Sequence, residues 1–298
     1  MTKGEPKDYD DAMRMVETQL GRLQTDTIDL YAWHGINNRE CLEIATRRGG
    51  ALTALERLRE EGVVRHIGFS THAPLDVILD AINTDRFEFI NLHFYYFFQR
   101  NLAAVIQAGL RDMGVFIISP NDKGGQLFNA PEKLKRFCAP LTPIQFNGRF
   151  CLSHPEAHTM TFGIDRPEYF DEAMGIPNGG HYLTPADLRI KLALDGQVEL
   201  LGDTYCTGCH TCLPCPEKVN ITEILRFRNM WKAYDMEQFG RYRYNMLEEK
   251  GHWFPGRYGS ACTECGDCLP RCPVRLDIPA LLRETHEGLY AAKDKGQT

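Results

Sequence analysis

Residues 262–273 read CTECGDCLPRCP, and this stretch decides how the C-terminal part of the chain folds. It contains Cys262, Cys265, Cys268 and Cys272, separated by two, two and three residues, with a proline straight after the last. Thiolates are the soft ligands that an iron-sulfur cluster needs, and three cysteines at every third residue can wrap one face of a cubane in a tight loop. The fourth cysteine lies too far along the chain to join that face easily. The spacing therefore predicts a partner motif elsewhere in the sequence.

The partner motif precedes this stretch. Its cysteines are Cys206, Cys209, Cys212 and Cys215, and Pro216 follows the last of them. In two-cluster ferredoxins the fourth cysteine of each motif binds the other cluster, so the eight cysteines of the two motifs predict two [4Fe-4S] clusters. The earlier motif leaves only two residues before its fourth cysteine where the later one leaves three, which keeps a single cluster as an alternative.

The similarity of the two motifs extends past the cysteines. Residues 215–222 read CPEKVNIT and residues 272–279 read CPVRLDIP, so both contain Cys-Pro, two variable residues, an aliphatic residue, Asn or Asp, and Ile. This is an internal repeat. In each copy the amide or carboxylate, Asn220 or Asp277, can cap an apolar helix that follows it.

Two other interpretations of the cysteines are structural zinc sites and disulfide bonds. Disulfides are disfavoured because Met1 is followed by a polar stretch with no apolar signal segment, which predicts a cytoplasmic, reducing location. The uninterrupted two-residue spacing, the closing Cys-Pro and the duplication favour iron-sulfur clusters over zinc. Cys41, Cys138 and Cys151 lie outside both motifs, and we expect buried free thiols there.

The composition narrows the class of protein further. The chain has 298 residues, 43% hydrophobic residues and a formal net charge of -6, which is typical of a protein with one large or two smaller domains. A mildly acidic balance argues against nucleic acid as a partner. No apolar run approaches the length that a bilayer requires, so we expect no membrane association.

Helical and strand patterns alternate through the first half of the chain. We expect helices at residues 8–23, 51–61, 74–82 and 102–111, and strands at residues 27–33, 63–69, 88–94 and 115–119. Beyond these, residues 142–152 and 167–173 are expected to be helical and residues 158–163 extended. Such alternation favours a parallel sheet covered by helices, either open or closed into a barrel. About five strand-helix units are visible, where a closed barrel needs about eight.

Several sequence segments of this half resemble the aldo-keto reductase family. Residues 20–31, LGRLQTDTIDLY, followed by His34, are similar to the most recognisable stretch of that family. Residues 62–70, Ser119-Pro120 and residues 162–168 fit later landmarks in order, so the resemblance covers about residues 2–174. Together with the cysteine-rich tail, the chain resembles a prokaryotic subgroup of aldo-keto reductases fused to a ferredoxin-like domain.

The resemblance implies an α/β fold in two parts. Residues 1–180 are expected to form a (β/α)8 TIM-barrel-like domain that is incomplete at its N-terminus, and residues 181–298 a small α-helical ferredoxin-like domain with [4Fe-4S] clusters. Roughly three strands are missing by this comparison. We favour a truncated gene model over the alternative that the tail or a second subunit covers the exposed sheet edge.

The resemblance also implies catalytic residues. In that family a Tyr, Lys, His and Asp tetrad reduces a carbonyl with a nicotinamide cofactor. Lys3 and His34 match the Lys and the His, while the Tyr and the Asp have no counterpart in this sequence. Without the resemblance, we would interpret Lys3 as a solvent-exposed lysine near the terminus, and His34 as a histidine at a strand end whose hydrogen bonds are made within the fold. Barrel enzymes nevertheless place catalytic groups at the carboxyl ends of strands.

Cofactor contacts are expected at the ends of later strands. The candidates for binding NADP(H) are Ser70, Asn91, Ser119, Lys123, Gly124 and Gly125. A solvated turn is an equal alternative for residues 119–125, and Ile118, Leu92 and Tyr169 depart from the family pattern. A nicotinamide gives up two electrons as hydride whereas a cluster accepts one, so coupling the two would need an intermediary such as a flavin.

Two functions remain open. The first is an iron-sulfur oxidoreductase that moves electrons to or from a small carbonyl-type substrate, with a ferredoxin or flavodoxin as a candidate electron partner. The second is an electron carrier or redox-sensing interaction protein whose barrel does not catalyse. Residues 226–258 combine arginines with aromatic residues, which we interpret as packing around the clusters rather than as a docking face for an electron carrier.

Overall fold

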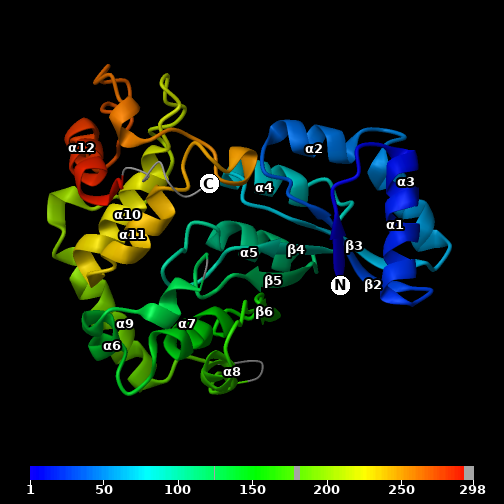
Figure 1. Ribbon diagram of the computed structural model, residues 1–298, viewed down its shortest axis with the longest axis horizontal. Helices are drawn as coiled ribbons and strands as arrows, with labels where there is room; N and C mark the ends of the chain where they lie inside the picture. Colours follow the sequence, from blue (N-terminus) through cyan, green and yellow to red (C-terminus); the bar gives the residue numbers. More distant parts are fainter. Residues whose placement is uncertain (124, 178–181, 292–298) are drawn as a thin grey trace, which may run out of the picture. The chain divides into compact units, whose positions relative to one another are not determined.

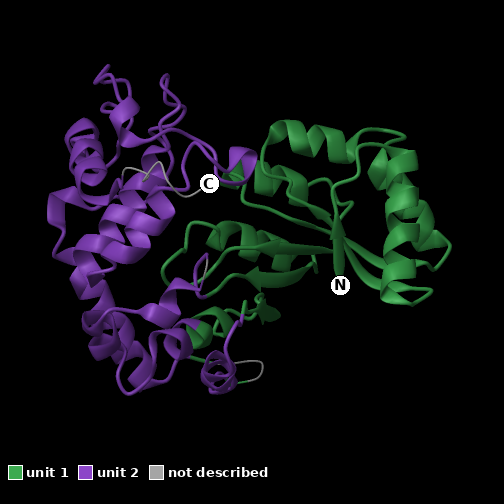
Figure 2. Cartoon of the chain, viewed as in Figure 1, with its two compact units in different colours: residues 1–120, 148–163, 177–182 green, residues 121–147, 164–176, 183–298 purple. Residues whose placement is uncertain are grey.

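The computed structural model describes residues 1–123, 125–177 and 182–291 (Figure 1). The chain divides into two compact units (Figure 2). Unit 1 comprises residues 1–120, 148–163 and 177–182, and unit 2 comprises residues 121–147, 164–176 and 183–298. The expected domain boundary between residues 180 and 181 lies outside the described residues.

Unit 1 is built on a parallel sheet. Within the described residues its strands are β1 Thr2–Gly4, β2 Ile28–His34, β3 Val64–Ser70, β4 Phe89–Leu92, β5 Gly114–Ile118 and β6 Thr159–Thr161. They lie side by side in sequence order from β1 to β6, and every neighbouring pair is parallel. This order is that of consecutive strand-helix units in the wall of a TIM-like barrel, so the expected α/β class is confirmed.

Helices connect the strands of unit 1. They are α1 Tyr9–Leu23, α2 Arg39–Thr46, α3 Ala51–Glu60, α4 Leu75–Ile82 and α5 Leu102–Leu110, and the residues of α7 Pro143–Leu152 are shared between the units. Asp8 begins α1 by accepting a hydrogen bond from the Asp11 amide at 2.8 Å. The core between sheet and helices contains Tyr31, Ile67 and Leu55, all fully buried.

The alternating elements expected from the sequence are present within a few residues of their expected bounds. Two elements of unit 1 were not expected from the periodicity of the residues. β1 has three residues, which is too short for an alternating pattern to show. α2 has eight, of which only Leu42 and Ala45 are buried, so its apolar face spans little more than one turn.

Unit 2 is helical. Its α-helices within the described residues are α6 Glu132–Cys138, α8 Pro167–Met174, α9 Pro185–Glu199, α10 Ile221–Tyr234, α11 Glu237–Tyr244 and α12 Ile278–Leu289. Asn220 caps α10 by accepting from the Glu223 amide at 3.4 Å, and Asp277 caps α12 by accepting from the Ala280 amide at 3.2 Å. Both caps were expected from the internal repeat. None of the helices in the described part of the chain is long and apolar enough to cross a membrane.

Candidate iron-sulfur and substrate sites

The eight cysteines of the two motifs surround two hollows in the described part of unit 2. We call the first the Cys206 hollow and the second the Cys262 hollow, each after the first cysteine of the motif that contributes three of its lining cysteines. The cysteines that line the Cys206 hollow are Cys206, Cys209, Cys212 and Cys272. Those that line the Cys262 hollow are Cys262, Cys265, Cys268 and Cys215. Each hollow therefore takes three cysteines from one motif and the fourth from the other, which is the grouping that the spacing led us to expect.

The turns that carry the fourth cysteines have the same backbone form in both copies of the repeat. The Lys218 amide donates to the carbonyl of Cys215 at 2.9 Å, and the Arg275 amide donates to the carbonyl of Cys272 at 3.1 Å. Lys218 and Arg275 have φ angles of 57° and 55°, in the left-handed region. The Cys-Pro step and this turn direct the chain away from each fourth cysteine toward the start of a helix.

Two polar side chains that sequence reasoning missed hold the cysteine loops in place. The Asn229 amide donates to the Cys206 carbonyl at 2.8 Å and accepts from the Cys206 amide at 3.4 Å. Arg271 donates to the carbonyl of Asp267 at 2.8 Å and to that of Pro214 at 3.1 Å, so it joins the two motifs. Arg271 is the one residue by which the later motif is longer than the earlier one. This difference in length was the only signal in the sequence that could have pointed to Arg271.

Electrostatics at the Cys206 hollow favour a positively charged occupant. Burial raises the pKa of Cys206 to about 11 and the pKa of Cys212 to about 12, so their thiolates need a compensating positive charge. Burial also acts to raise the pKa of Cys209, but hydrogen bonds from Thr211 and Thr207 outweigh it and lower that pKa. Iron supplies the charge that stabilises such thiolates.

The hollows differ from a site for a single ion. A tetrahedral zinc with Zn–S bonds of about 2.3 Å holds its sulfur atoms about 3.8 Å apart. Among the residues that the structure describes, no three His, Cys, Asp or Glu side chains are grouped so as to hold one metal ion. The four cysteines of each hollow are therefore grouped more loosely than one tetrahedral ion would hold them, and a larger group such as a cubane cluster suits this grouping.

In unit 1 the candidate residues lie in one row of the sheet. His34 is paired with Ser70, and Ser70 with Asn91, at the carboxyl ends of β2, β3 and β4. Lys3 is paired with Ala32, two residues before His34. Because paired positions of neighbouring strands share a face and positions two apart along a strand do too, these four residues occupy one face of the sheet. The structure thus brings together Lys3, His34, Ser70 and Asn91.

The burial of these residues is consistent with a ligand-binding site. Lys3 is half-buried, and burial lowers the pKa of its ammonium group. Ser70 is buried, and its hydroxyl oxygen accepts from the Gly35 amide at 3.1 Å. Asn91 is fully buried, and its carbonyl oxygen has no hydrogen-bond partner within the described residues. A buried amide oxygen without a donor is costly, so this atom is a plausible contact for a ligand's donor.

The other predicted cofactor contacts are distributed differently. Ser119 follows β5 in unit 1 with a φ angle of 49°, whereas Lys123 and Gly125 belong to unit 2. Gly124 lies outside the described residues. His72 was missed by sequence reasoning; it follows β3, and its ring centroid lies 4.8 Å from that of His93, which follows β4. Both histidines extend the polar character of the carboxyl ends of these strands.

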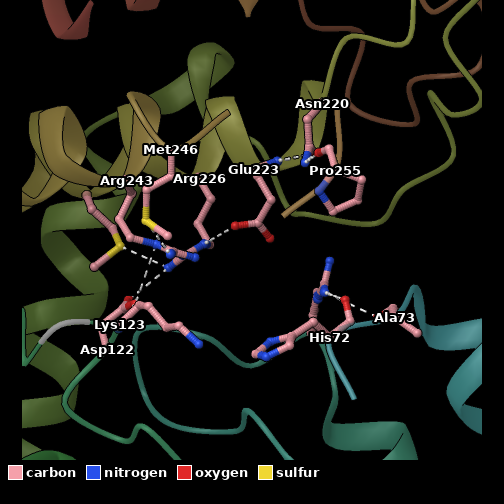
Figure 3. A network of polar contacts seen from close by, with 12 residues as sticks. His72, Ala73, Asp122, Lys123, Asn220, Glu223, Arg226, Arg243, Met246 and Pro255 are labelled. Atoms are coloured by element: carbon pink, nitrogen blue, oxygen red, sulfur yellow. Dashed lines mark hydrogen bonds and ion pairs between the residues drawn. The ribbon is translucent and has the colours of Figure 1, made fainter. Parts of the chain in front are cut away.

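Asp122, next to Lys123, belongs to a buried charge network in unit 2 (Figure 3). Arg226 of α10 lies 3.3 Å from the Asp122 carboxylate and 3.2 Å from that of Glu223. Arg243 of α11 approaches Asp122 at 4.0 Å and packs 4.4 Å from the ring centroid of Phe254. Arg243 is buried and Arg226 is largely covered, which agrees with the interpretation of residues 226–258 as packing around the cysteine region.

The comparisons with known proteins match two separate regions of the chain. Residues 1–133 match the aldo/keto reductase family, and residues 205–276 match the 4Fe-4S dicluster domain. Among curated proteins, none shows significant similarity to this sequence. The N-terminal region is therefore similar to the aldo/keto reductases, a family of oxidoreductases, and the C-terminal region to 4Fe-4S dicluster domains.

Solved structures show the same fold. The chain is similar to the holo form of aldo-keto reductase AKR11C1 from Bacillus halodurans, with 21% identity, a TM-score of 0.53, and 64% of this chain and 70% of that one covered. It is also similar to MGS-M4, an aldo-keto reductase from a Medee basin deep-sea metagenome library, with 19% identity, a TM-score of 0.50, and 64% and 70% covered. At these identities the likeness establishes the fold of the barrel-like region and leaves its substrate open.

Proposed function

We propose that this protein is an iron-sulfur oxidoreductase that binds one [4Fe-4S] cluster in each hollow and exchanges electrons with a small carbonyl-type substrate. The observation that carries the proposal is the exchange of Cys215 and Cys272 between the motifs, which gives each hollow four cysteines. Such clusters supply one-electron transfer when bound. A ferredoxin or flavodoxin is the class of partner that delivers or removes electrons singly.

The substrate site that we propose is the row at the carboxyl ends of β2 to β4. Converting a carbonyl to an alcohol takes two electrons and two protons, so two single-electron transfers are needed for each substrate molecule. His34 is proposed to hydrogen-bond to the carbonyl oxygen and to hold the proton that this oxygen receives. The Lys3 ammonium would favour negative charge on that oxygen, since both residues share one face of the sheet.

Ser70, Asn91 and Ser119 of unit 1 are proposed as contacts for NADP(H), and the expectation that Lys123, Gly124 and Gly125 also bind this cofactor stays a prediction. With this cofactor, one hydride and one proton reach the carbonyl, and electrons from the cysteine region enter only through a two-electron to one-electron intermediary such as a flavin. The buried oxygen of the Asn91 amide, which has no hydrogen-bond partner in the part of the chain that the structure describes, supports a donor group of the cofactor at this position.

The test uses anaerobically purified full-length protein. Its visible spectrum is recorded before and after NADPH, and then after dithionite, and the reduced protein is mixed with a panel of aldehydes and ketones. We expect dithionite to bleach the spectrum and a carbonyl substrate to restore it, with loss of that restoration in His34→Gln. If no carbonyl compound reoxidises the protein but a ferredoxin does, the chain is an electron carrier with a non-catalytic barrel.

A further inference from the structure

The internal repeat allows the two hollows to be compared position by position. Leu225 lines the Cys206 hollow, and Leu282, at the same position of the repeat, lines the Cys262 hollow. Ile278 and Ile221 are another such pair. These matched aliphatic residues give both hollows similar apolar walls. The positions at which the walls differ therefore indicate how the two clusters would differ.

Three repeat positions that line the hollows carry different chemistry. In the Cys206 hollow they are occupied by Thr222, Thr211 and Val274, and in the Cys262 hollow by Pro279, Asp267 and Glu217. The Thr222 hydroxyl corresponds to the Pro279 ring, which has no donor, and the Thr211 hydroxyl corresponds to the Asp267 carboxylate. At the third position the apolar Val274 corresponds to the Glu217 carboxylate. A cluster becomes more negative when it gains an electron, so donors favour its reduced form and carboxylates oppose it.

Thr222 is the most informative of these residues. It is the second residue of α10 and only 3% exposed, and its hydroxyl oxygen has no hydrogen-bond partner within the described residues. By contrast, the buried hydroxyl of Thr285 in α12 donates to the carbonyl of Leu281 at 2.6 Å. Thr222 lies too near the start of its helix to have a preceding helical turn that offers such a carbonyl. A buried hydroxyl with no acceptor is costly, and Thr222 lines the Cys206 hollow.

Three charged residues, Glu223, Arg271 and Arg257, act against this difference between the hollows. Glu223 is close enough to Cys206 to raise the pKa of that thiol, but its carboxylate is 3.2 Å from the Arg226 guanidinium, which offsets its charge. Arg271 lines the Cys262 hollow and donates to the backbone carbonyls of Asp267 and Pro214. The Glu217 carboxylate lies 3.9 Å from the Arg257 guanidinium in an exposed ion pair, whereas at the positions of Asp267 and Pro279 the Cys206 hollow has neither a carboxylate nor a proline ring.

We propose that the Thr222 hydroxyl donates a hydrogen bond to a sulfur atom of the cluster in the Cys206 hollow and makes this cluster the one with the higher reduction potential. One electron then passes from the reduced cluster in the Cys262 hollow to the oxidised cluster in the Cys206 hollow. A one-electron donor of the ferredoxin or flavodoxin class replaces the electron at the Cys262 hollow. This inference rests on the proposed function, because it requires both hollows to hold clusters.

The test is a redox titration of the anaerobic full-length protein, followed by electron paramagnetic resonance of the reduced clusters, with iron and sulfide counted in each sample. We expect two midpoint potentials in the unaltered protein. Thr222→Val keeps the shape of the side chain but removes the hydroxyl. It should lower the higher midpoint potential by at least about 59 mV, which for one electron equals a tenfold change in the ratio of reduced to oxidised cluster. Thr222→Ser should keep the midpoint of the unaltered protein. A shift of the lower midpoint, or no shift, in Thr222→Val overturns the proposal.

Variants of the other hollow complete the test. Pro279→Thr places a hydroxyl at the matching position of α12 and should raise the lower midpoint, and Asp267→Asn should raise the same midpoint by removing a charge. If either variant moves the higher midpoint instead, the assignment of potentials to hollows is wrong. Two identical midpoints in a fully loaded protein would overturn this inference and leave the proposed function standing. A protein that binds no iron would overturn both.

Discussion

The cysteine region of unit 2 and the sheet of unit 1 differ in how completely their own residues form a site. Each hollow in unit 2 is lined by four cysteines, and the side chains of Asn229 and Arg271 donate hydrogen bonds to backbone carbonyls of the loops that carry these cysteines. The row in unit 1 brings His34 and Lys3 onto one face of the sheet, and their catalytic roles stay a prediction. The comparison teaches that a cluster site can be assigned from a single helical region, whereas a catalytic site needs residues from many strand ends.

The largest effect should come from breaking the exchange of cysteines between motifs. Cys272→Ala removes a ligand from the Cys206 hollow although Cys272 belongs to the later motif. We expect loss of the cluster in that hollow and about half of the iron, with the other cluster retained. Iron counting and electron paramagnetic resonance measure this, and Cys41→Ala, outside both motifs, is the control. Loss of the cluster beside Cys262, Cys265 and Cys268 instead would contradict the exchange.

The next largest effect tests the proposed catalytic role of His34 at the end of strand β2. His34→Gln should lower the rate at which a carbonyl substrate reoxidises the reduced protein by about 100-fold or more, because a positioned acid typically contributes that much. The visible spectrum of the clusters should stay unchanged. His66→Gln is the matched control, since His66 lies on the neighbouring strand β3 and is exposed and bonded to Glu88 at 2.8 Å. Equal rates for the His34 variant and the control would remove His34 from the proposed site.

A change of pH should affect cluster assembly in unit 2 more than the folding of unit 1. Burial raises the pKa of Cys206 to about 11, so this thiol is protonated at neutral pH and must lose its proton when iron binds. Cluster assembly is therefore favoured as the pH rises toward that pKa and opposed as the pH falls. We expect iron incorporation to be faster and more complete at pH 9 than at pH 6.5 (on the order of several-fold). Folding of unit 1, followed by the fluorescence of Trp33, should change little over the same range.

The smallest of the predicted effects concerns the support of a cysteine loop. Asn229→Ala removes two hydrogen bonds to the backbone of Cys206 and should destabilise the loaded iron-sulfur region by about 1–3 kcal/mol. Thermal unfolding monitored by loss of cluster absorbance measures this. Asn83→Ala, at an exposed position of unit 1, is the control. An Asn229 variant as stable as the control would mean that this loop needs no support from α10.

Sequence reasoning succeeded where the signal is local. The cysteine spacing, the capping residues Asn220 and Asp277, and the alternation of strands and helices all depend on neighbours within a few residues along the chain. It missed Asn229 and Arg271, because their partners lie far away along the chain and no pattern marks a residue that bonds to a distant carbonyl. The meeting of His34, Ser70 and Asn91 was implied by the family resemblance, since the order of strands in a sheet is not encoded in any one stretch.

The central claim is that two [4Fe-4S] clusters occupy hollows formed by exchanged cysteines. The most direct test is to count iron and acid-labile sulfide in anaerobically purified protein and to record the Mössbauer spectrum of the same sample. The account predicts about eight iron and eight sulfide per chain, with all the iron in [4Fe-4S] clusters. A colourless protein that contains zinc, or one with about four iron in a single cluster, would contradict it.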